Sequence, residues 1–275
     1  REGTNKAMQP LFIVHGISGN IFKFYTLTTW MNPERNIYGL QAVGLDGKER
    51  PLSTIEEMAA RHIDEIKKVQ PKGPYALAGG PCGGLIAYEM AIQLKKMNEQ
   101  VNYLALLDLE ASDSVSSLPP GIREIRKGQL FAVRAIKRVH TFATANEIER
   151  REYLKKKKEE ATKSPEEYES WVDRHKLSGT LGEESTRNFK AVEANNYQVI
   201  KNYKPGIYEG DAVLFRTEDT YYNNTYTYDL GWKNIIKGNL TILKNSGNHN
   251  TMIFNPNAST LALKLDEGLV KAGAI

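Results

Sequence analysis

Short runs of consecutive apolar residues alternate along this chain with stretches in which apolar residues recur at helical spacing. Several of the runs are apolar at every position, which is typical of strands covered on both faces. Helical spacing is seen over residues 55–69, 85–97 and 258–270. The alternation predicts an α/β fold with a mostly parallel central sheet flanked by helices. The expected strands cover residues 11–15, 37–43, 75–78, 101–107, 212–216 and 240–243.

The stretch from residue 113 to residue 186 interrupts this alternation. It shows little β pattern and much charge, and apolar side chains recur in it at roughly helical intervals. We interpret it as a helical insertion on the rim of the core. The core then comprises residues 1–112 and 187–275, with residues 1–9 expected to be the remnant of a linker in a longer protein.

Composition excludes several classes of protein. The 37 Lys and Arg residues nearly balance the 33 Asp and Glu residues, and a formal net charge of +4 over 275 residues does not suggest nucleic-acid binding. No apolar run approaches the roughly 18–20 residues that a membrane span needs. The single cysteine, Cys82, excludes an internal disulfide framework. We therefore expect a cytoplasmic protein with neither a nucleic-acid nor a membrane partner.

One five-residue motif, Gly80-Pro81-Cys82-Gly83-Gly84, lies between an expected strand and an expected helix. It fits the nucleophile-elbow pattern G-x-S-x-G with cysteine in place of serine. In such an elbow the chain turns sharply, so we expect a strained backbone at Cys82, with Gly80 and Gly84 letting strand and helix approach. The turn places the thiol at a helix N-terminus, where the dipole favours an anion. The motif predicts that Cys82 is a nucleophile.

Five histidines are candidates for the base that a nucleophile requires. His249 lies in the loop after the last expected strand, at the edge of the sheet where the elbow is expected. His15 ends the first strand and is expected to shape the backbone there, and His62 suits packing on a helix face. His140 and His175 lie in the charged insertion. We therefore predict that His249 is the base.

The remaining parts of the site are predicted from position alone. Three acids, Asp108, Glu218 and Asp219, follow strands at the same edge of the sheet, and geometry leaves the choice among them open. Backbone N–H groups of Gly83 and Ile17 are the expected oxyanion donors. No phosphate-binding loop and no cluster with metal-ligand spacing is visible, so neither a metal nor a cofactor is expected.

Several segments together resemble the thioesterase domains that end modular nonribosomal peptide and polyketide synthases, which have the α/β-hydrolase fold. The resemblance covers most of the chain, and the order and spacing of its parts make it specific. It is carried by residues 10–16, 37–47, 51–60, 75–90 and 104–108, by Gly231-Trp232 and by Gly247-Asn248-His249.

The resemblance implies a catalytic triad of Cys82, Asp108 and His249, with Asp219 as the alternative acid. It also implies that the insertion is a lid over the active site. The substrate would be an acyl or peptidyl thioester, delivered on the phosphopantetheine arm of a carrier protein in the same polypeptide and released by cyclisation or hydrolysis. The sequence departs from the family pattern at Cys82 and at Pro81, and we interpret the cysteine as natural because the elbow itself has diverged.

Two other functions fit the same residues. A hydrolase of the dienelactone-hydrolase type would use a Cys-His-Asp triad on free lactones or small esters and would need no carrier. A catalytically weak acyl-binding or docking module of a synthase would retain the fold with an unreactive Cys82.

Overall fold

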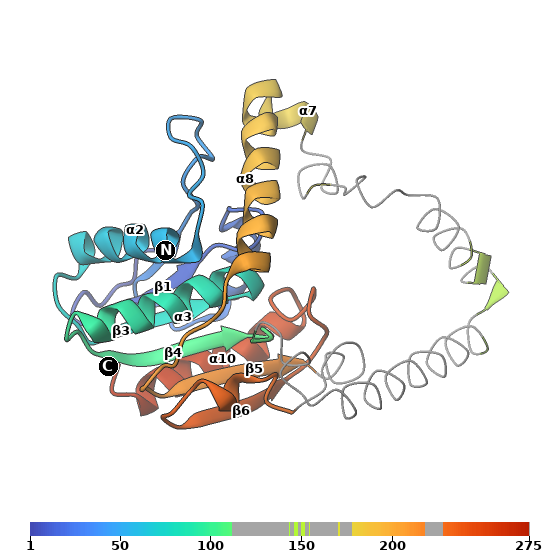
Figure 1. Ribbon diagram of the computed structural model, residues 1–275. Coiled ribbons are helices and arrows are strands. Elements are labelled where there is room, and N and C mark those ends of the chain that lie inside the picture. The colour runs from blue at the N-terminus through green and yellow to red at the C-terminus, as the bar shows by residue number, and fades with distance from the viewer. Residues whose placement is uncertain are drawn as a thin grey trace, which may run out of the picture.

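Six parallel strands form one sheet in the order β2-β1-β3-β4-β5-β6 (Figure 1). This computed structural model describes residues 1–111, 178–217 and 228–274, with residues 143, 146, 147, 150, 151, 154 and 170 between them. The predicted α/β fold with a parallel sheet is confirmed. The strands are β1 (Leu11–Val14), β2 (Ile37–Leu40), β3 (Tyr75–Gly79), β4 (Val101–Leu107), β5 (Ala212–Thr217) and β6 (Leu240–Asn245).

Helices cover both faces of this sheet. Helices α2 and α3, with the end of α8, pack on one face, and α1 and α10 pack on the other (Figure 1). The helices are α1 (Tyr25–Trp30), α2 (Ile55–Val69), α3 (Pro81–Lys96), α7 (Ser178–Leu181), α8 (Glu183–Asn202) and α10 (Asn257–Lys271), with short 3-10 helices η1 (Phe22–Phe24) and η2 (Trp232–Asn234).

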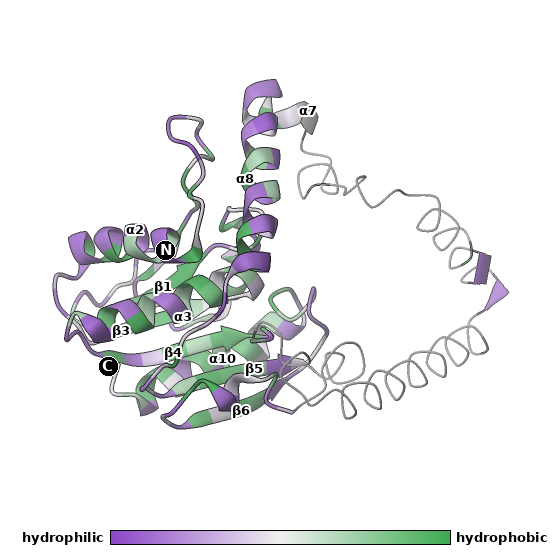
Figure 2. Cartoon of the chain, viewed as in Figure 1, coloured by the Kyte–Doolittle hydropathy of each residue, from purple (hydrophilic) through white to green (hydrophobic). Residues whose placement is uncertain are grey.

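The two-sided covering explains the consecutive apolar residues of the strands. In β1, Phe12 and Val14 belong to the core under α2 and α3, whereas Leu11 and Ile13 belong to the core under α1 and α10. All four side chains are buried. The central strands are accordingly mostly hydrophobic, whereas the outer surface of α2 is polar (Figure 2).

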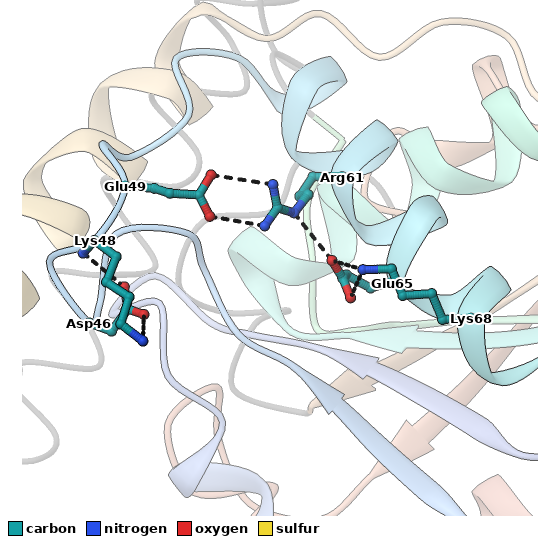
Figure 3. Close-up of polar contacts among 6 residues, drawn as sticks. All are labelled: Asp46, Lys48, Glu49, Arg61, Glu65 and Lys68. Atoms are coloured by element: carbon teal, nitrogen blue, oxygen red, sulfur yellow. Dashed lines mark hydrogen bonds and ion pairs between the residues drawn. The ribbon is translucent and has the colours of Figure 1, made fainter.

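Helix α2 matches its predicted bounds, and its first turn shows why it begins there. The Thr54 hydroxyl accepts a hydrogen bond from the Glu57 N–H at 3.1 Å, and the Glu57 carboxylate accepts one from the Ser53 N–H at 2.9 Å. On the solvent side, Arg61 pairs with Glu49 of the preceding loop and with Glu65 (Figure 3). Such exposed pairs stabilise little, so packing of the apolar face and the N-terminal cap hold this helix.

Helix α8 was not expected, because its residues combine charged positions with few apolar ones. Its buried face includes two polar residues, Glu193 and Asn196, beside Val192 and Val199. The helix continues through residue 187, where the second core segment was predicted to begin. Most of the predicted insertion, residues 113–186, lies outside the described residues. Within the described part of the chain, no helix is long and apolar enough to cross a membrane.

Thr54→Ala removes the side-chain acceptor at the start of α2, and we expect it to lower the free energy of unfolding by about 1 kcal/mol. Urea denaturation followed by circular dichroism measures the change. Thr54→Ser is the matched control, because it keeps the hydroxyl group. Equal losses in both variants would contradict the assignment of the cap.

Candidate active site

Cys82 lies in the first turn of α3, directly after the end of β3. The expected strained backbone is wrong at this position: among the described non-glycine residues, positive φ occurs at Asn98, Asp108 and Leu230. Pro81 explains the difference. Its ring holds φ near the helical value and suits the first helical position, so α3 begins one residue before the nucleophile.

Glycines allow the elbow to pack closely against β1 and β3. A Cβ atom at Gly83 would lie 2.2 Å from the carbonyl oxygen of His15, and one at Gly79 would lie 2.3 Å from the backbone of Gly83. A Cβ at Gly84 would lie 3.0 Å from the Gly79 carbonyl oxygen. The space beside Gly80 faces Lys23 and Phe24 instead, so Gly79 takes the role that was predicted for Gly80.

The thiol of Cys82 is fully buried. Burial raises its pKa to about 12, and the ammonium group of Lys23 opposes this shift. A helix N-terminus also favours the thiolate over the thiol. Two opposing influences therefore act on the same sulfur atom: burial disfavours its negative charge, and the neighbouring positive charges favour it.

Asp108 and His249 form a direct hydrogen bond. The Nδ1 atom of His249 lies 2.9 Å from Oδ2 of Asp108. The carboxylate can only accept, so Nδ1 carries the proton and Nε2 remains free to accept another. The Asp108 side chain is completely buried, whereas that of His249 is 45% exposed. This arrangement fixes the orientation of the imidazole at the solvent-accessible side of the site.

Thr217, the last residue of β5, fixes the Asp108 carboxylate. Its backbone N–H donates to Oδ1 at 2.9 Å and its hydroxyl donates to Oδ2 at 3.0 Å. Asp108 itself has a φ of 48°, in the left-handed region that Asp tolerates better than most residues. The carboxylate, which follows β4, is thus held by donors from Thr217 at the end of β5 and from His249 after β6, and these three strands are neighbours in the sheet.

The loop that carries His249 is held by side-chain hydrogen bonds of its own. Asn248 Oδ1 accepts from the N–H groups of Asn250 and Thr251, and the Thr251 hydroxyl accepts from the Asn248 N–H. These bonds form a tight turn at His249. The asparagine in Gly247-Asn248-His249, a segment noted in the sequence, is therefore explained by the hydrogen bonds that its side chain makes in this turn.

The predicted residues fall into two groups. Asp108 and His249 are joined, and Cys82 lies near Lys23, but no hydrogen bond links Cys82 to His249 in the described part of the chain. Catalytic hydrogen bonds are often long in the absence of substrate and tighten when it binds. The alternative acids Glu218 and Asp219 lie outside the described residues, as do His140 and His175.

The other two histidines are neutral packing residues. His15 and His62 are buried with their rings in edge-to-face contact at 5.5 Å. Burial lowers the pKa of His15 to about 4 and that of His62 to about 3. His15 Nδ1 lies 2.8 Å from the carbonyl oxygen of Gly16, to which it donates. His15 thereby shapes the loop after β1, the role predicted for it.

The predicted oxyanion donors come from adjoining segments. Gly83 lies in the first turn of α3, against the end of β1, and Ile17 lies in the loop that follows β1. Asn196 of α8 donates to the Ile17 carbonyl oxygen at 2.9 Å. This contact ties the loop to α8, and the sequence carried no signal for it because α8 itself was not expected.

Among the described residues, no group of three or more His, Cys, Asp or Glu side chains is placed to hold a metal ion. The side chains around the candidate site that sequence reasoning missed are Thr217, Asn196 and Lys23. Thr217 had a faint signal, since it directly follows an expected strand at the edge where the acids were sought. Lys23 had none, because a lysine in a short segment between a strand and a helix is ordinary.

Comparisons with known proteins agree on one family. The family model described as "Thioesterase domain" matches residues 9–262. The chain is 40% identical over 207 residues to malpibaldin synthetase of Mortierella alpina, covering 75% of this chain and 3% of that protein. It is 30% identical over 217 residues to a dimodular nonribosomal peptide synthase of Bacillus subtilis (strain 168), covering 76% of this chain and 8% of that protein.

A solved structure shares the fold over nearly the whole chain. It is the NocB thioesterase domain in covalent complex with a fluorophosphonate nocardicin G analogue, with a TM-score of 0.63 and 19% identity. The similarity covers 95% of this chain and 94% of that one. The chain spans only a small part of the two curated relatives, so it corresponds to one domain of each.

Asp108→Asn is expected to reverse the tautomer of His249. The Thr217 N–H requires an oxygen acceptor, so the substituted amide should turn its NH₂ group toward His249 and donate to Nδ1. Nε2 then carries the proton and cannot accept one, and we expect the reactivity of Cys82 to fall by about 10⁴-fold.

Nitrogen-15 NMR of the His249 ring reports the tautomer directly. Asp46→Asn is the matched control, because it changes an exposed carboxylate that pairs with Lys48. An unchanged Nδ1–H tautomer in Asp108→Asn would contradict the assigned role of Asp108.

Proposed function

Because the chain belongs to the thioesterase domain family, we propose that it releases an acyl or peptidyl chain from a carrier-protein phosphopantetheine thioester through an acyl-Cys82 intermediate. The observation that carries this proposal is the hydrogen bond between Asp108 and His249 at the edge of the sheet that also bears Cys82. An imidazole held in one tautomer and a nucleophile elbow at the same edge of a sheet are the groups that acyl transfer uses.

The first half-reaction transfers the acyl group to the enzyme. His249 Nε2 accepts the thiol proton as Cys82 attacks the thioester carbonyl, and Asp108 stabilises the imidazolium that forms. The N–H groups of Gly83 and Ile17 hold the oxyanion of the tetrahedral intermediate. The carbon–sulfur bond to phosphopantetheine then breaks, and His249 returns its proton to the departing carrier thiol.

The second half-reaction frees the acyl chain. A second nucleophile attacks acyl-Cys82, and His249 accepts its proton. Water gives the free acid, whereas an amine or hydroxyl of the chain itself gives a ring. The Cys82 thiolate leaves and regains a proton from His249, which restores the enzyme. The chemistry needs no metal and no cofactor beyond the arm that delivers the substrate.

Cysteine changes the energetics of the intermediate. Transfer from a carrier thioester to serine forms a more stable oxygen ester, whereas transfer to Cys82 exchanges one thioester for another. The intermediate therefore keeps its activation for the second step. We propose that this suits release by a weak or hindered nucleophile, by an amine, or by formation of a strained ring.

The partner that we propose is an acyl or peptidyl carrier domain of the same polypeptide. Support comes from the relatives, which are synthetases of which this chain corresponds to 3% and 8%. A domain embedded in so long a chain meets its carrier at high effective concentration, so affinity between the two can be low.

Intact-protein mass spectrometry after incubation with an acyl-loaded carrier domain tests the intermediate. We expect a mass increase of one acyl group, mapped to Cys82, and its loss with time as product forms. Cys82→Ala should show no adduct, and His249→Ala should acquire it much more slowly. Product formation by Cys82→Ala at the rate of the parent protein would contradict the proposal.

Cys82→Ser tests the advantage assigned to sulfur. We expect the serine variant to release product more slowly by at least about tenfold, equivalent to about 1.4 kcal/mol in the barrier, with the acyl adduct accumulating. Single-turnover kinetics with the same acyl carrier separate the two steps. Equal or faster release by the serine variant would show that sulfur gives no advantage.

A further inference from the structure

The side chain of Lys23 reaches the elbow that contains Cys82 from a separate, earlier segment of the chain. It lies in η1, after β1, and its side chain extends back over the loop toward the start of α3. A Cβ atom added at Gly16 would lie 2.2 Å from Lys23 Nζ, and one added at Gly80 would lie 3.4 Å from it. The ammonium group therefore occupies the space between the loop after β1 and the elbow.

This ammonium group has no anionic partner in the described part of the chain. No carboxylate there forms an ion pair with it, and Nζ lies 5.0 Å from the centroid of the Phe24 ring. The Lys23 residue is half-buried, so its charge is partly withdrawn from water. Burial lowers the pKa of Lys23 to about 8, and interaction with Cys82 acts in the opposite direction.

The other titratable groups at this end of the sheet do not supply the same charge. His15 at the end of β1 and His62 of α2 are buried, with their pKa values lowered to about 4 and about 3, so both are neutral at physiological pH. The Asp108 carboxylate, after β4, accepts hydrogen bonds from Thr217 and from His249 of the loop after β6. Among these described groups, Lys23 is therefore the one that carries a positive charge near the elbow at neutral pH.

We propose that Lys23 is a positioning residue for the nucleophile, and that its ammonium group stabilises negative charge on the Cys82 sulfur as the thiol loses its proton. This inference rests on the proposed function in taking Cys82 as the nucleophile. It gives a physical reason for cysteine at the elbow: a thiol loses its proton far more readily than a serine hydroxyl, so a neighbouring ammonium can stabilise the thiolate, whereas a serine alkoxide is not formed.

Ultraviolet titration of the thiolate near 240 nm tests the proposal without any acyl substrate. Subtracting the titration of Cys82→Ser isolates the single thiol. An opposite charge at close range typically shifts a pKa by about 1–3 units. We therefore expect Lys23→Met to raise the titration midpoint by at least about one pH unit, which is a tenfold smaller thiolate fraction at neutral pH.

Two further variants separate charge from structure. Lys23→Arg keeps the positive charge and should restore most of the shift, and Lys23→Gln, which also removes the charge, should reproduce the behaviour of Lys23→Met. Lys48→Met is the matched control, because Lys48 is exposed and pairs with Asp46. Its midpoint should equal that of the parent.

An unchanged midpoint in Lys23→Met and Lys23→Gln overturns the proposal. The same holds if these variants leave the thiol titration unchanged and raise only the KM for an acyl carrier, since Lys23 would then contact substrate instead. Failure of the proposed function is distinguishable: it would appear as the absence of an acyl adduct on the parent protein, whatever the titration shows.

A double-mutant comparison adds a kinetic readout. If the ammonium group acts through the sulfur, Lys23→Met should slow acylation about tenfold or more in the cysteine enzyme and much less in the Cys82→Ser background. Equal effects in the two backgrounds overturn the proposal, because a merely structural lysine would affect both alike.

Discussion

The buried carboxylate of Asp108 joins the ends of three neighbouring strands, and the arrangement of the site depends on it. It accepts from the Thr217 backbone, the Thr217 hydroxyl and the His249 ring. Hydrogen bonds to a charged group are each worth about 1.5–3 kcal/mol, and removal of a single donor leaves a buried charge less compensated. The parallel sheet makes this possible, because the carboxyl ends of β4, β5 and β6 meet at one edge.

The nucleophile shows a different balance of forces. Pro81 lets α3 begin directly after β3, so the thiol sits in the first helical turn and not on a strained bend. Close packing of Gly83 and Gly79 against backbone then buries it completely. Burial alone would keep the thiol protonated, so the helix terminus and Lys23 matter more here than they would at an exposed cysteine.

Pattern and spacing predicted most of the fold. All six strands were expected, because strands buried on both faces need apolar residues at consecutive positions, and α2 was expected with its observed ends. Helix α8 was missed because its buried face includes Glu193 and Asn196, whose burial depends on partners distant in sequence. For the site, the elbow and the loop of His249 were found from local motifs, whereas residue positions alone left Asp108, Glu218 and Asp219 equivalent.

Local sequence patterns were therefore enough to predict the alternation of strands and helices, the elbow at Cys82 and the edge of the sheet that bears the candidate site. The family resemblance implied Asp108 as the acid, but only the folded chain shows that its carboxylate meets His249, 141 residues away, that Thr217 holds it, and that Lys23 lies at the elbow. The reason is physical. Periodicity and turn chemistry act between near neighbours, whereas a buried charge selects its partners by distance in space, which no spacing in the sequence encodes.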